Sequence, residues 1–215
     1  MEMETFSNLC VAVFERATED YHVTDSVDAA IRNPFDPQSI EAQLYRKNWI
    51  DAVQWHLEDL IRDPQITPDS VVALKRRIDR SNKDRTDLVE HIDSYCLNKY
   101  NNVCPMPDAR LNTESPAWAI DRLSILVLKI YHWQQDVNRP DVDDAHRRTG
   151  EQKLAVQLEQ KQDLSLALDQ LLDDIAHGKK YMKAYRQMKM YNDPSLNPVL
   201  YGRKKQPDAA GEMQK

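Results

Sequence analysis

The sequence predicts an all-α protein, a helical bundle of about five main helices with a long C-terminal helix. Three observations support this fold class. The 215 residues include only 4 glycines, which favours long helices over turn-rich β structure. Strong helix formers such as Leu, Ala, Gln, Glu, Lys and Arg are plentiful. Apolar residues recur at spacings of three and four, and the alternating pattern of a half-buried strand is absent.

The composition limits the class of protein further. A hydrophobic fraction of 41% is enough for one core, so residues 1–202 are expected to form a single all-helical domain and residues 203–215 a flexible basic and polar tail. No run approaches 18 apolar residues, which predicts that no segment spans a membrane. The N-terminal residues lack the apolar region of a secretory signal, and the three cysteines fit neither a disulfide framework nor a zinc site. We therefore expect a cytoplasmic protein.

Two apolar faces predict the first two helices. Residues 4–30 carry apolar side chains at helical spacing and predict the first helix. Asp36 is a good N-cap and Pro37 a good first helical residue, so the second helix is expected to span residues 37–62. It should stop at the Asp-Pro pair that follows, because the residue before a proline avoids the helical region.

The last three helices have clear starts and less clear ends. A Thr-Pro pair and a Ser-Pro pair predict that the third and fourth helices begin at residues 68 and 116 and span about 68–100 and 116–137. The fourth is the most apolar and is expected at the centre of the bundle, because apolar residues lie on nearly all its sides. The fifth is expected to span residues 143–192, with Gly150 and Gly178 as points of weakness or bending.

The middle of the third helix has polar residues where its apolar stripe should continue. Between Ile78 and Leu88 the stripe passes through Asn82 and Arg85. A buried arginine must be paired and hydrogen-bonded, or it costs several kcal/mol. One interpretation is that Arg85 ties this helix to a carboxylate on a neighbouring helix. The other is that both residues line a polar pocket.

Similar polar residues fall at inward positions of three helices. They are Asn48, His56, Glu58, Asp59 and Arg62 in the second helix, Asp79, Asn82, Arg85, Glu90 and Asp93 in the third, and Asp121, Lys129 and His132 in the fourth. Lys129 lies in the most apolar helix, where a lysine needs a carboxylate or an anionic ligand nearby. The set predicts a polar cavity between these three helices, the usual place for ligands in a bundle.

A first interpretation of this set is a pocket that binds, and in an enzyme would process, an anionic small molecule such as a sugar phosphate or a nucleotide sugar. The candidate ligand-binding residues are Asn48, Arg62, Asn82, Arg85 and Lys129, and the candidate catalytic residues are His56, Glu58 and Asp59. The cations would hold phosphate or carboxylate groups, and the amides would orient the ligand. The histidine would carry a proton near neutral pH.

A second interpretation is a magnesium site. The hard oxygen ligands would be Glu58, Asp59, Asp79, Glu90 and Asp93. All-helical nucleotide hydrolases hold Mg²⁺ with E-x-x-E and E-x-x-D motifs on adjacent helices. Residues 90–93 match the second motif, whereas the first is replaced by an adjacent pair of acids. A di-iron bundle is not expected, because it needs two E-x-x-H motifs and the chain has one, at residues 19–22.

A third interpretation is a non-catalytic scaffold or interaction protein, in which these polar groups form salt bridges between helices. The two main alternatives predict different structures. A ligand site should leave an open cleft with Arg62, Arg85 and Lys129 unpaired, whereas a scaffold should pair each of them and leave no cavity.

Basic residues gather near the C-terminus. Lys and Arg are frequent between residues 179 and 205, where Asp193 is the one acidic residue. No aromatic-basic RNA-binding motif accompanies them, so nucleic acid is not an expected partner. The long last helix is compatible with a homo-oligomer.

Several long motifs carry a family resemblance. They are Leu44–Trp49, Trp55–Asp59 with Arg62, Arg77–Asp79 with Asn82, Arg85, Glu90 and Ile92–Asp93, Thr113–Pro116, Asp121–Ile125 with Lys129, Lys189–Pro194, and Asn197–Gly202. Over residues 1–202 the chain resembles a bacterial family, common in Bacteroidetes-type bacteria, known as domain of unknown function 4254. The resemblance implies an association with glycosyltransferases of envelope-polysaccharide synthesis. It therefore implies a link to sugar or nucleotide-sugar metabolism, or a scaffold role in envelope-polysaccharide assembly.

Overall fold

The computed structural model describes residues 5–186, 188, 190 and 193–202. The chain divides into two units, Met1–Ala184 and Tyr185–Lys215, and each is described by itself. Nearly all the secondary structure belongs to the first unit. The second contains the short helix α6 (Pro198–Gly202). Residues 203–215, for which a flexible tail is expected, lie outside the described residues.

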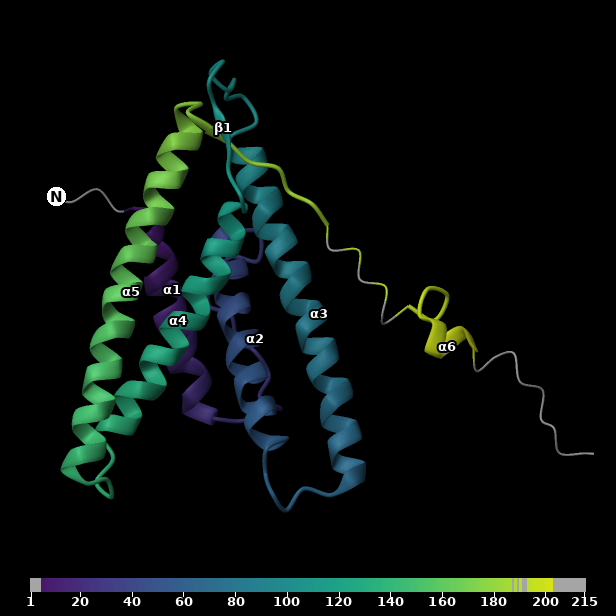
Figure 1. Cartoon of the computed structure of the whole chain (residues 1–215), viewed down its shortest axis with the longest axis vertical. Coiled ribbons are helices and arrows are strands. Elements are labelled where there is room, and N and C mark those ends of the chain that lie inside the picture. Colours follow the sequence, from purple (N-terminus) through teal and green to yellow (C-terminus); the bar gives the residue numbers. More distant parts are fainter. Residues whose placement is uncertain (1–4, 187, 189, 191–192, 203–215) are drawn as a thin grey trace, which may run out of the picture. The chain divides into compact units, whose positions relative to one another are not determined.

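The first unit is a bundle of five long helices, which confirms the all-α prediction (Figure 1). The helices are α1 (Phe6–Thr24), α2 (Ile40–Leu60), α3 (Pro68–Lys99), α4 (Pro116–Val137) and α5 (Asp144–Ala176), with two short strands β1 (Arg110–Leu111) and β2 (Lys180–Tyr181). No helix in the described part of the chain is long and apolar enough to cross a membrane.

Helices α1, α2 and α4 run in one direction, and α3 and α5 run in the opposite direction (Figure 1). The parallel pair α1 and α2 requires a long return connection, which residues 25–39 provide. Fifteen residues can reach about 50 Å, more than the roughly 31 Å length of α2. Arg77 of α3 holds this connection by bonding to the carbonyl oxygen of Val27 at 2.5 Å and to the carboxylate of Asp28 at 2.6 Å. As a result, the C-terminal ends of α1, α2 and α4 share one end of the bundle.

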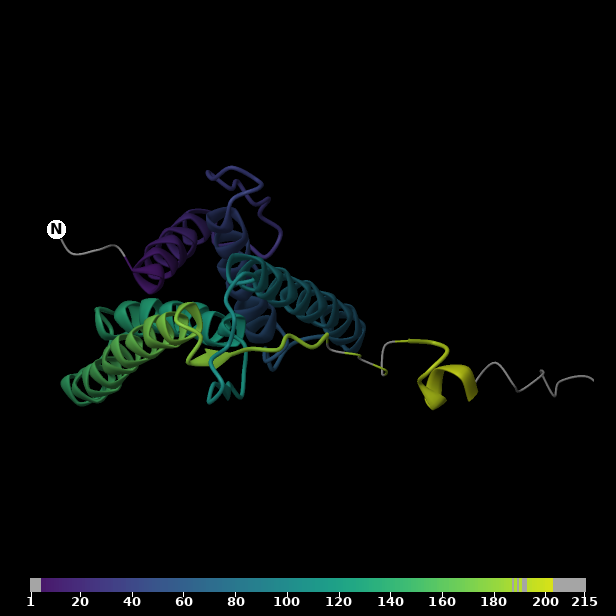
Figure 2. The same ribbon diagram turned by 90° about the horizontal axis from the view of Figure 1, so that it is seen from above.

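Helix α4 is the central element, as its apolar sequence predicts. It packs against α1, α2, α3 and α5, and the view from above shows it between α5 and the other helices (Figure 2). Its residues Ile120, Leu123 and Leu128 are buried, together with aromatic residues such as Phe14 and Tyr45 of the neighbouring helices. Burial of each such large side chain stabilises the fold by about 1.5–3 kcal/mol.

The structure confirms two helix starts and corrects a third. Helices α3 and α4 begin at the predicted prolines, and the hydroxyl of Thr67 caps α3 by accepting a hydrogen bond from the amide of Ser70 at 3.3 Å. Helix α2 begins at Ile40, later than predicted, because Ser39 is its N-cap. Asp36 instead closes a turn by accepting a hydrogen bond from the amide of Gln38 at 2.8 Å.

Two helices end earlier than predicted. Helix α1 stops at Thr24, where Asp25 takes a left-handed conformation with φ 50°. Helix α5 stops at Ala176, before Gly178, which has φ 69° and whose carbonyl oxygen accepts a hydrogen bond from the amide of Met106 at 2.8 Å. The chain after it forms β2, which pairs in parallel with β1. The prediction that this helix continues beyond residue 178 was therefore wrong in the described residues, and the two strands are a short addition to the all-α fold.

Candidate functional site

A buried ion-pair network lies between α2, α3 and α4, where the sequence predicts a polar cavity. Lys47 is completely buried and pairs with Asp51 on its own helix and with Asp121 on α4, the latter at 3.0 Å. Arg85 of α3 binds both carboxylate oxygens of Asp121, at 3.0 and 2.7 Å, and lies 3.4 Å from Asp51. Two cations thus balance two anions, and the predicted tie from Arg85 to a carboxylate on another helix is confirmed.

Hydrogen bonds extend this network to α1. The hydroxyl of Thr18 donates to Asn48 Oδ1 at 2.8 Å, and Asn48 Nδ2 lies 3.2 Å from both the carbonyl oxygen and the hydroxyl of Ser124. Ser124 in turn donates to Asp51 Oδ2 at 2.6 Å. Asn48 therefore joins three helices from a fully buried position. Its polar atoms are engaged with protein groups rather than turned towards a ligand.

The charges of the network act on its carboxyl groups. Burial alone would raise the pKa of Asp121, but hydrogen bonds from Arg85 and the charges of Lys47 and Arg85 hold that pKa below its usual value. For Asp51, burial prevails and raises the pKa, although Lys47 and the hydroxyl of Ser124 oppose the shift. Such mutually paired groups are typical of a structural polar core.

Three other predicted site residues are not buried: two are exposed and one is half-buried. Arg62 follows the end of α2, its side chain is 66% exposed, and it pairs with Glu58 at 3.3 Å. Asp59 is exposed, and Asn82 of α3 is half-buried. The inward positions expected for Arg62 and Asp59 were wrong, because α2 ends at Leu60 and its final residues are exposed although Leu57 is buried.

The five candidate magnesium ligands are not brought together. Asp79 pairs with Lys75 on the outside of α3, whereas Asp93 is buried and burial raises its pKa. These two aspartates are separated by about 21 Å along the helix axis at 1.5 Å per residue. Glu58 is engaged with Arg62, and Glu90 is half-buried on α3. The five acidic residues therefore lie at the end of α2 and along α3, and they do not converge on one point.

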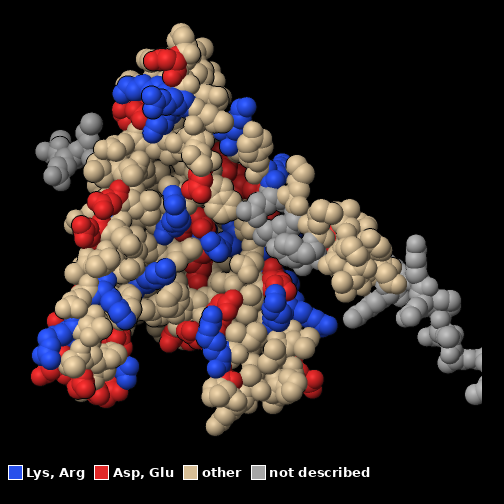
Figure 3. All heavy atoms as spheres, viewed as in Figure 1, with Lys and Arg blue, Asp and Glu red and all other residues tan. Residues whose placement is uncertain are grey.

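Lys129 is exposed, contrary to the expectation that it is buried in the central helix. It stands at a cavity of about 440 Å³ between α2, α4 and α5. The lining residues are Trp55, Lys129, His132, Trp133, Asp136, His146, Thr149, Gly150 and Lys153. Figure 3 shows a notch between the lower end of the α4–α5 pair and that of the α2–α3 pair, with basic side chains on its α4–α5 side. We call this cavity the tryptophan pocket.

The tryptophan pocket combines aromatic walls with cations. The ammonium of Lys153 lies 4.9 Å from the centre of the Trp133 ring. Asp136 is the one acidic lining residue, and it is already bound to His146 at 2.7 Å. The hydrogen bond from His146 is the main reason that the pKa of Asp136 is lowered. Lys129 makes no ion pair or hydrogen bond with any residue that the structure describes.

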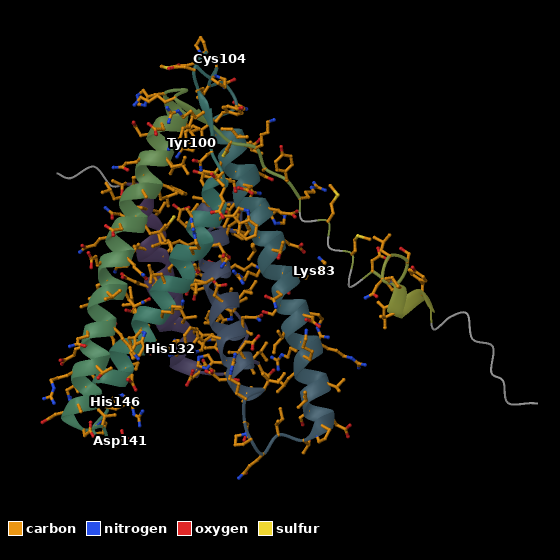
Figure 4. The ribbon with its side chains drawn as sticks, viewed as in Figure 1. Lys83, Tyr100, Cys104, His132, Asp141 and His146 are labelled. Atoms are coloured by element: carbon orange, nitrogen blue, oxygen red, sulfur yellow. The ribbon has the colours of Figure 1, made fainter. Side chains whose placement is uncertain are left out.

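Three histidines converge beside this pocket, and we call them the histidine cluster. They are His22 of α1, His56 of α2 and His132 of α4, and one ring nitrogen of each lies within 4.8 Å of the others. The Nε2 atoms of His22 and His56 are 3.3 Å apart. Figure 4 shows His132 in the lower half of the bundle, on the side of His146 and away from Tyr100 and Cys104. Within the described ranges, no other group of three potential metal ligands converges in this way.

Burial favours the neutral form of two members of the cluster, His132 and His22. It lowers the pKa of His132 to about 4, with His22 and His56 adding to the shift. It also lowers the pKa of His22, although a hydrogen bond with the carbonyl oxygen of Thr18 opposes the change. Of the predicted catalytic residues, only His56 belongs to this cluster. Neither His56 nor its acidic neighbours at 58 and 59 line the tryptophan pocket.

Sequence reasoning missed this cluster because its members lie far apart in the chain. His22 comes from the last turn of α1 and is half-buried between α2 and α4. The spacing of residues 22, 56 and 132 matches no metal-binding motif. A usable signal was present in the chain itself, since each histidine lies next to an aromatic residue, in Tyr21-His22, Trp55-His56 and Tyr131-His132.

Comparison with known proteins assigns the chain to a family without giving it an activity. No curated protein and no solved structure matches it. One family, described as "Protein of unknown function (DUF4254)", matches residues 41–184. The match contains the tryptophan pocket, the four charged members of the buried network and two of the three histidines, while α1 with His22 precedes it. By this match over most of its length, the chain belongs to the DUF4254 family.

Proposed function

We propose that the protein binds a small anionic molecule that carries a ring, of the sugar phosphate or nucleotide sugar class, in the tryptophan pocket. The observation that carries the proposal is Lys129, a lysine of the central helix that stands at a cavity without an acidic partner among the described residues. Lys129 and Lys153 would bind the anionic group. Trp55 and Trp133 would pack against the ring.

The size and charge of the pocket support this proposal. Ligand pockets in proteins commonly enclose about 300–1,000 Å³, and this one encloses about 440 Å³. Its two lysines face one carboxylate, Asp136, which His146 and Arg139 already engage at 2.7 and 3.3 Å. A positive charge therefore remains for a ligand to neutralise.

The aromatic residues support a ring-shaped ligand. Trp55 and Trp133 come from different helices, α2 and α4, and both line the cavity. Indole rings present a large apolar face with a partially negative surface, which favours contact with the polarised C–H groups of a sugar or with the face of a base. Such a face gives little affinity for a small inorganic anion, so we expect the organic part of the ligand to contribute.

The pocket also bears on the choice between a ligand-binding protein and a pure scaffold. A pure scaffold was expected to pair Arg62, Arg85 and Lys129 and to leave no cavity. The structure pairs Arg62 and Arg85 but leaves Lys129 at an open pocket. The paired residues support a structural role for the polar core, and Lys129 supports ligand binding at a neighbouring place. A scaffold that assists envelope-polysaccharide assembly remains the alternative outcome of the test below.

The test is thermal unfolding of the wild type and of the double variant Lys129→Gln/Lys153→Gln, with sugar phosphates, nucleotide sugars, inorganic phosphate and neutral sugars. A ligand at 100 times its Kd stabilises the folded state by about 2.7 kcal/mol. For a chain of this size that corresponds to a rise in Tm of roughly 5–10 °C. We expect one of the ring-bearing anions to give such a rise in the wild type and a much smaller one in the double variant.

Lys83→Gln is the matched control. Lys83 is an exposed lysine of α3 that pairs with Asp87 at 2.5 Å and is far from the pocket (Figure 4). Its substitution should leave the ligand effect unchanged. Equal stabilisation of the double variant and the wild type would show that the anion binds elsewhere. If no compound of the panel raises the Tm of the wild type, ligand binding is contradicted and the scaffold alternative gains support.

A further inference from the structure

We propose that His22, His56 and His132 form a binding site for a divalent transition metal ion of the zinc type, with the three imidazoles as ligands. Nothing in the family assignment provides for such a site, and the proposal holds whether or not the tryptophan pocket binds an anion. It is argued from the positions of the ring nitrogens, their hydrogen bonds and the packing of the rings.

The distances between nitrogens fit a tetrahedral ion. With Zn–N distances of 2.0–2.1 Å and tetrahedral angles, two ligating nitrogens should be about 3.3 Å apart. The Nε2 atoms of His22 and His56 are separated by 3.3 Å. The ligand atom of His132 lies within 4.8 Å of both, and we expect its ring to rotate on metal binding so that all three nitrogens reach coordinating distance.

The hydrogen bonds of the cluster are compatible with a metal, which would replace the 3.3 Å hydrogen bond between Nε2 of His22 and Nε2 of His56. Nδ1 of His22 lies 2.7 Å from the carbonyl oxygen of Thr18 and donates its proton to it. This bond leaves the lone pair on Nε2, and a backbone carbonyl on the other ring nitrogen is the usual way in which proteins orient a metal-binding histidine. Nε2 of His132 is buried and has no hydrogen-bond partner among the residues that the structure describes. A metal ion would supply the partner that this atom lacks.

Each imidazole is held against a different aromatic ring. His56 stacks on Tyr21 with centroids 5.3 Å apart, and His132 stacks on Trp55 at 4.6 Å. His22 packs on Tyr131 at 4.2 Å. These contacts restrict the rotation of the rings before any ion binds. A site whose ligands are already oriented loses less side-chain entropy on binding, which raises its affinity.

Electrostatic features at this end of the bundle favour a cation. Asp25, the residue that ends α1, places Oδ1 3.5 Å from Nε2 of His56. Its carboxylate would balance part of the charge of the ion. His22 lies in the last turn of α1, where the helix dipole is negative. Three imidazole nitrogens suit zinc and its neighbours better than magnesium, which prefers oxygen ligands.

The experiment is a titration of the full chain with zinc chloride by calorimetry, without an affinity tag and after removal of metals by a chelator. The exposed thiol of Cys104 is replaced by serine in every sample, because a free thiol could bind zinc by itself. We expect one zinc per chain. The variants His22→Gln, His56→Gln and His132→Gln should each weaken binding by about 100-fold or more, since loss of even an outer partner of a ligand costs about 10–100-fold.

His177→Gln is the matched control. His177 is exposed, follows α5 and bonds to Asp173 on its own helix, and its substitution should leave zinc affinity unchanged. Absence of zinc binding in the Cys104→Ser protein overturns the proposal. So does zinc affinity that is unchanged in any of the three cluster variants, because the site needs all three imidazoles.

A spectroscopic measurement covers the case in which a variant does not fold. The imidazole nitrogens of the Cys104→Ser protein can be observed by NMR with and without zinc. We expect zinc to shift Nε2 of His22 while its Nδ1 keeps the proton bound to Thr18, and to shift nitrogens of His56 and His132 as well. If zinc leaves these three imidazoles unchanged, the cluster is an aromatic packing feature and not a metal site.

Discussion

The imidazole of His132 stacks on the indole of Trp55, with ring centroids 4.6 Å apart and planes 11° from parallel. The two residues join α4 to α2 and both line the tryptophan pocket. His132 also belongs to the histidine cluster, which places Nε2 of its ring in a buried environment. This ring pair is therefore a wall shared by the pocket and the cluster. A substitution of Trp55 should affect binding at both.

Trp55→Ala is expected to destabilise the protein and to weaken both proposed sites. Loss of a half-buried indole should lower the free energy of unfolding by about 2–3 kcal/mol, below the 3–5 kcal/mol of a fully buried aromatic residue. Without its stacking partner His132 gains rotational freedom, so zinc affinity should also fall. Urea unfolding and the zinc titration measure these effects.

Trp55→Phe is the control for this prediction. A phenyl ring keeps a flat surface for His132 to stack on but covers less of the pocket. We expect it to restore most of the stability and zinc affinity, and less of the ligand binding. An equal loss of zinc affinity in the two variants would contradict the role given to stacking.

Arg85→Gln is expected to cost about 2–4 kcal/mol at pH 7, because it leaves Asp121 and Asp51 with Lys47 as their sole cation. The pKa of Asp121 is lowered in the folded state, so the ionised carboxylate stabilises the fold above the usual value of 3.8. This stabilisation is lost as the pH falls through the lowered pKa. The difference between wild type and variant should therefore shrink as the pH falls below about 4, which urea unfolding at a series of pH values can measure.

The control for this prediction is Arg62→Gln, which removes an exposed ion pair at the C-terminal end of α2. Pairs of this kind contribute about 0–1 kcal/mol, so the variant should unfold almost as the wild type does at every pH tested. If Arg85→Gln lowers the free energy of unfolding by the same amount from pH 7 to pH 3, the charge of Asp121 is not the cause of the loss.

The sequence predicted the helices best where local chemistry marks their starts. Thr67 and Ser115, each followed by proline, placed the beginnings of α3 and α4 correctly. The prediction from the sequence failed at the end of α5, where the helical pattern of apolar residues continues beyond Gly178. That glycine ends the helix because it takes positive φ and packs against the backbone near Cys104. Cys104 is more than seventy residues away from Gly178 in the sequence, and the spacing of apolar residues contains no information about this contact.

The buried network could be predicted in part, and the histidine cluster could not. Arg85 interrupts an apolar stripe, so its need for a carboxylate was evident, and Asp121 was among the candidates. The cluster depends on α1 and α2 running in parallel, which follows from the path of residues 25–39 along the bundle. Lys129 was misplaced because its neighbours Leu128 and Ile130 are buried. A position between them can still reach solvent where α2 and α5 leave a gap, and helical patterns do not show such gaps.

Gly150 in α5 and Gly178 just after its end are both closely packed, which leads to a prediction about their substitution. A Cβ atom at Gly150 would lie 2.6 Å from Cγ1 of Val137 on α4, and one at Gly178 would lie 2.7 Å from the backbone oxygen of Cys104. Gly150→Ala gains about 1 kcal/mol of helix propensity, but the clash in a packed site costs about 1–3 kcal/mol. We expect a net loss of about 1 kcal/mol. Gly178→Ala should cost about 2–4 kcal/mol, since it combines a clash with backbone and a left-handed conformation.

A second substitution distinguishes the causes of these two losses. Val137→Ala removes the methyl group that would meet the new Cβ at position 150. The double variant Gly150→Ala/Val137→Ala should therefore be more stable than the sum of the single effects predicts, by about 1 kcal/mol or more. No side-chain substitution should rescue Gly178→Ala in this way, because its obstacle is the backbone of Cys104. Urea unfolding of the four single and double variants, compared at equal m-values, measures the coupling. Strict additivity at positions 150 and 137 would mean that α4 and α5 separate to admit the methyl group, in which case the tryptophan pocket between them should widen and lose ligand affinity.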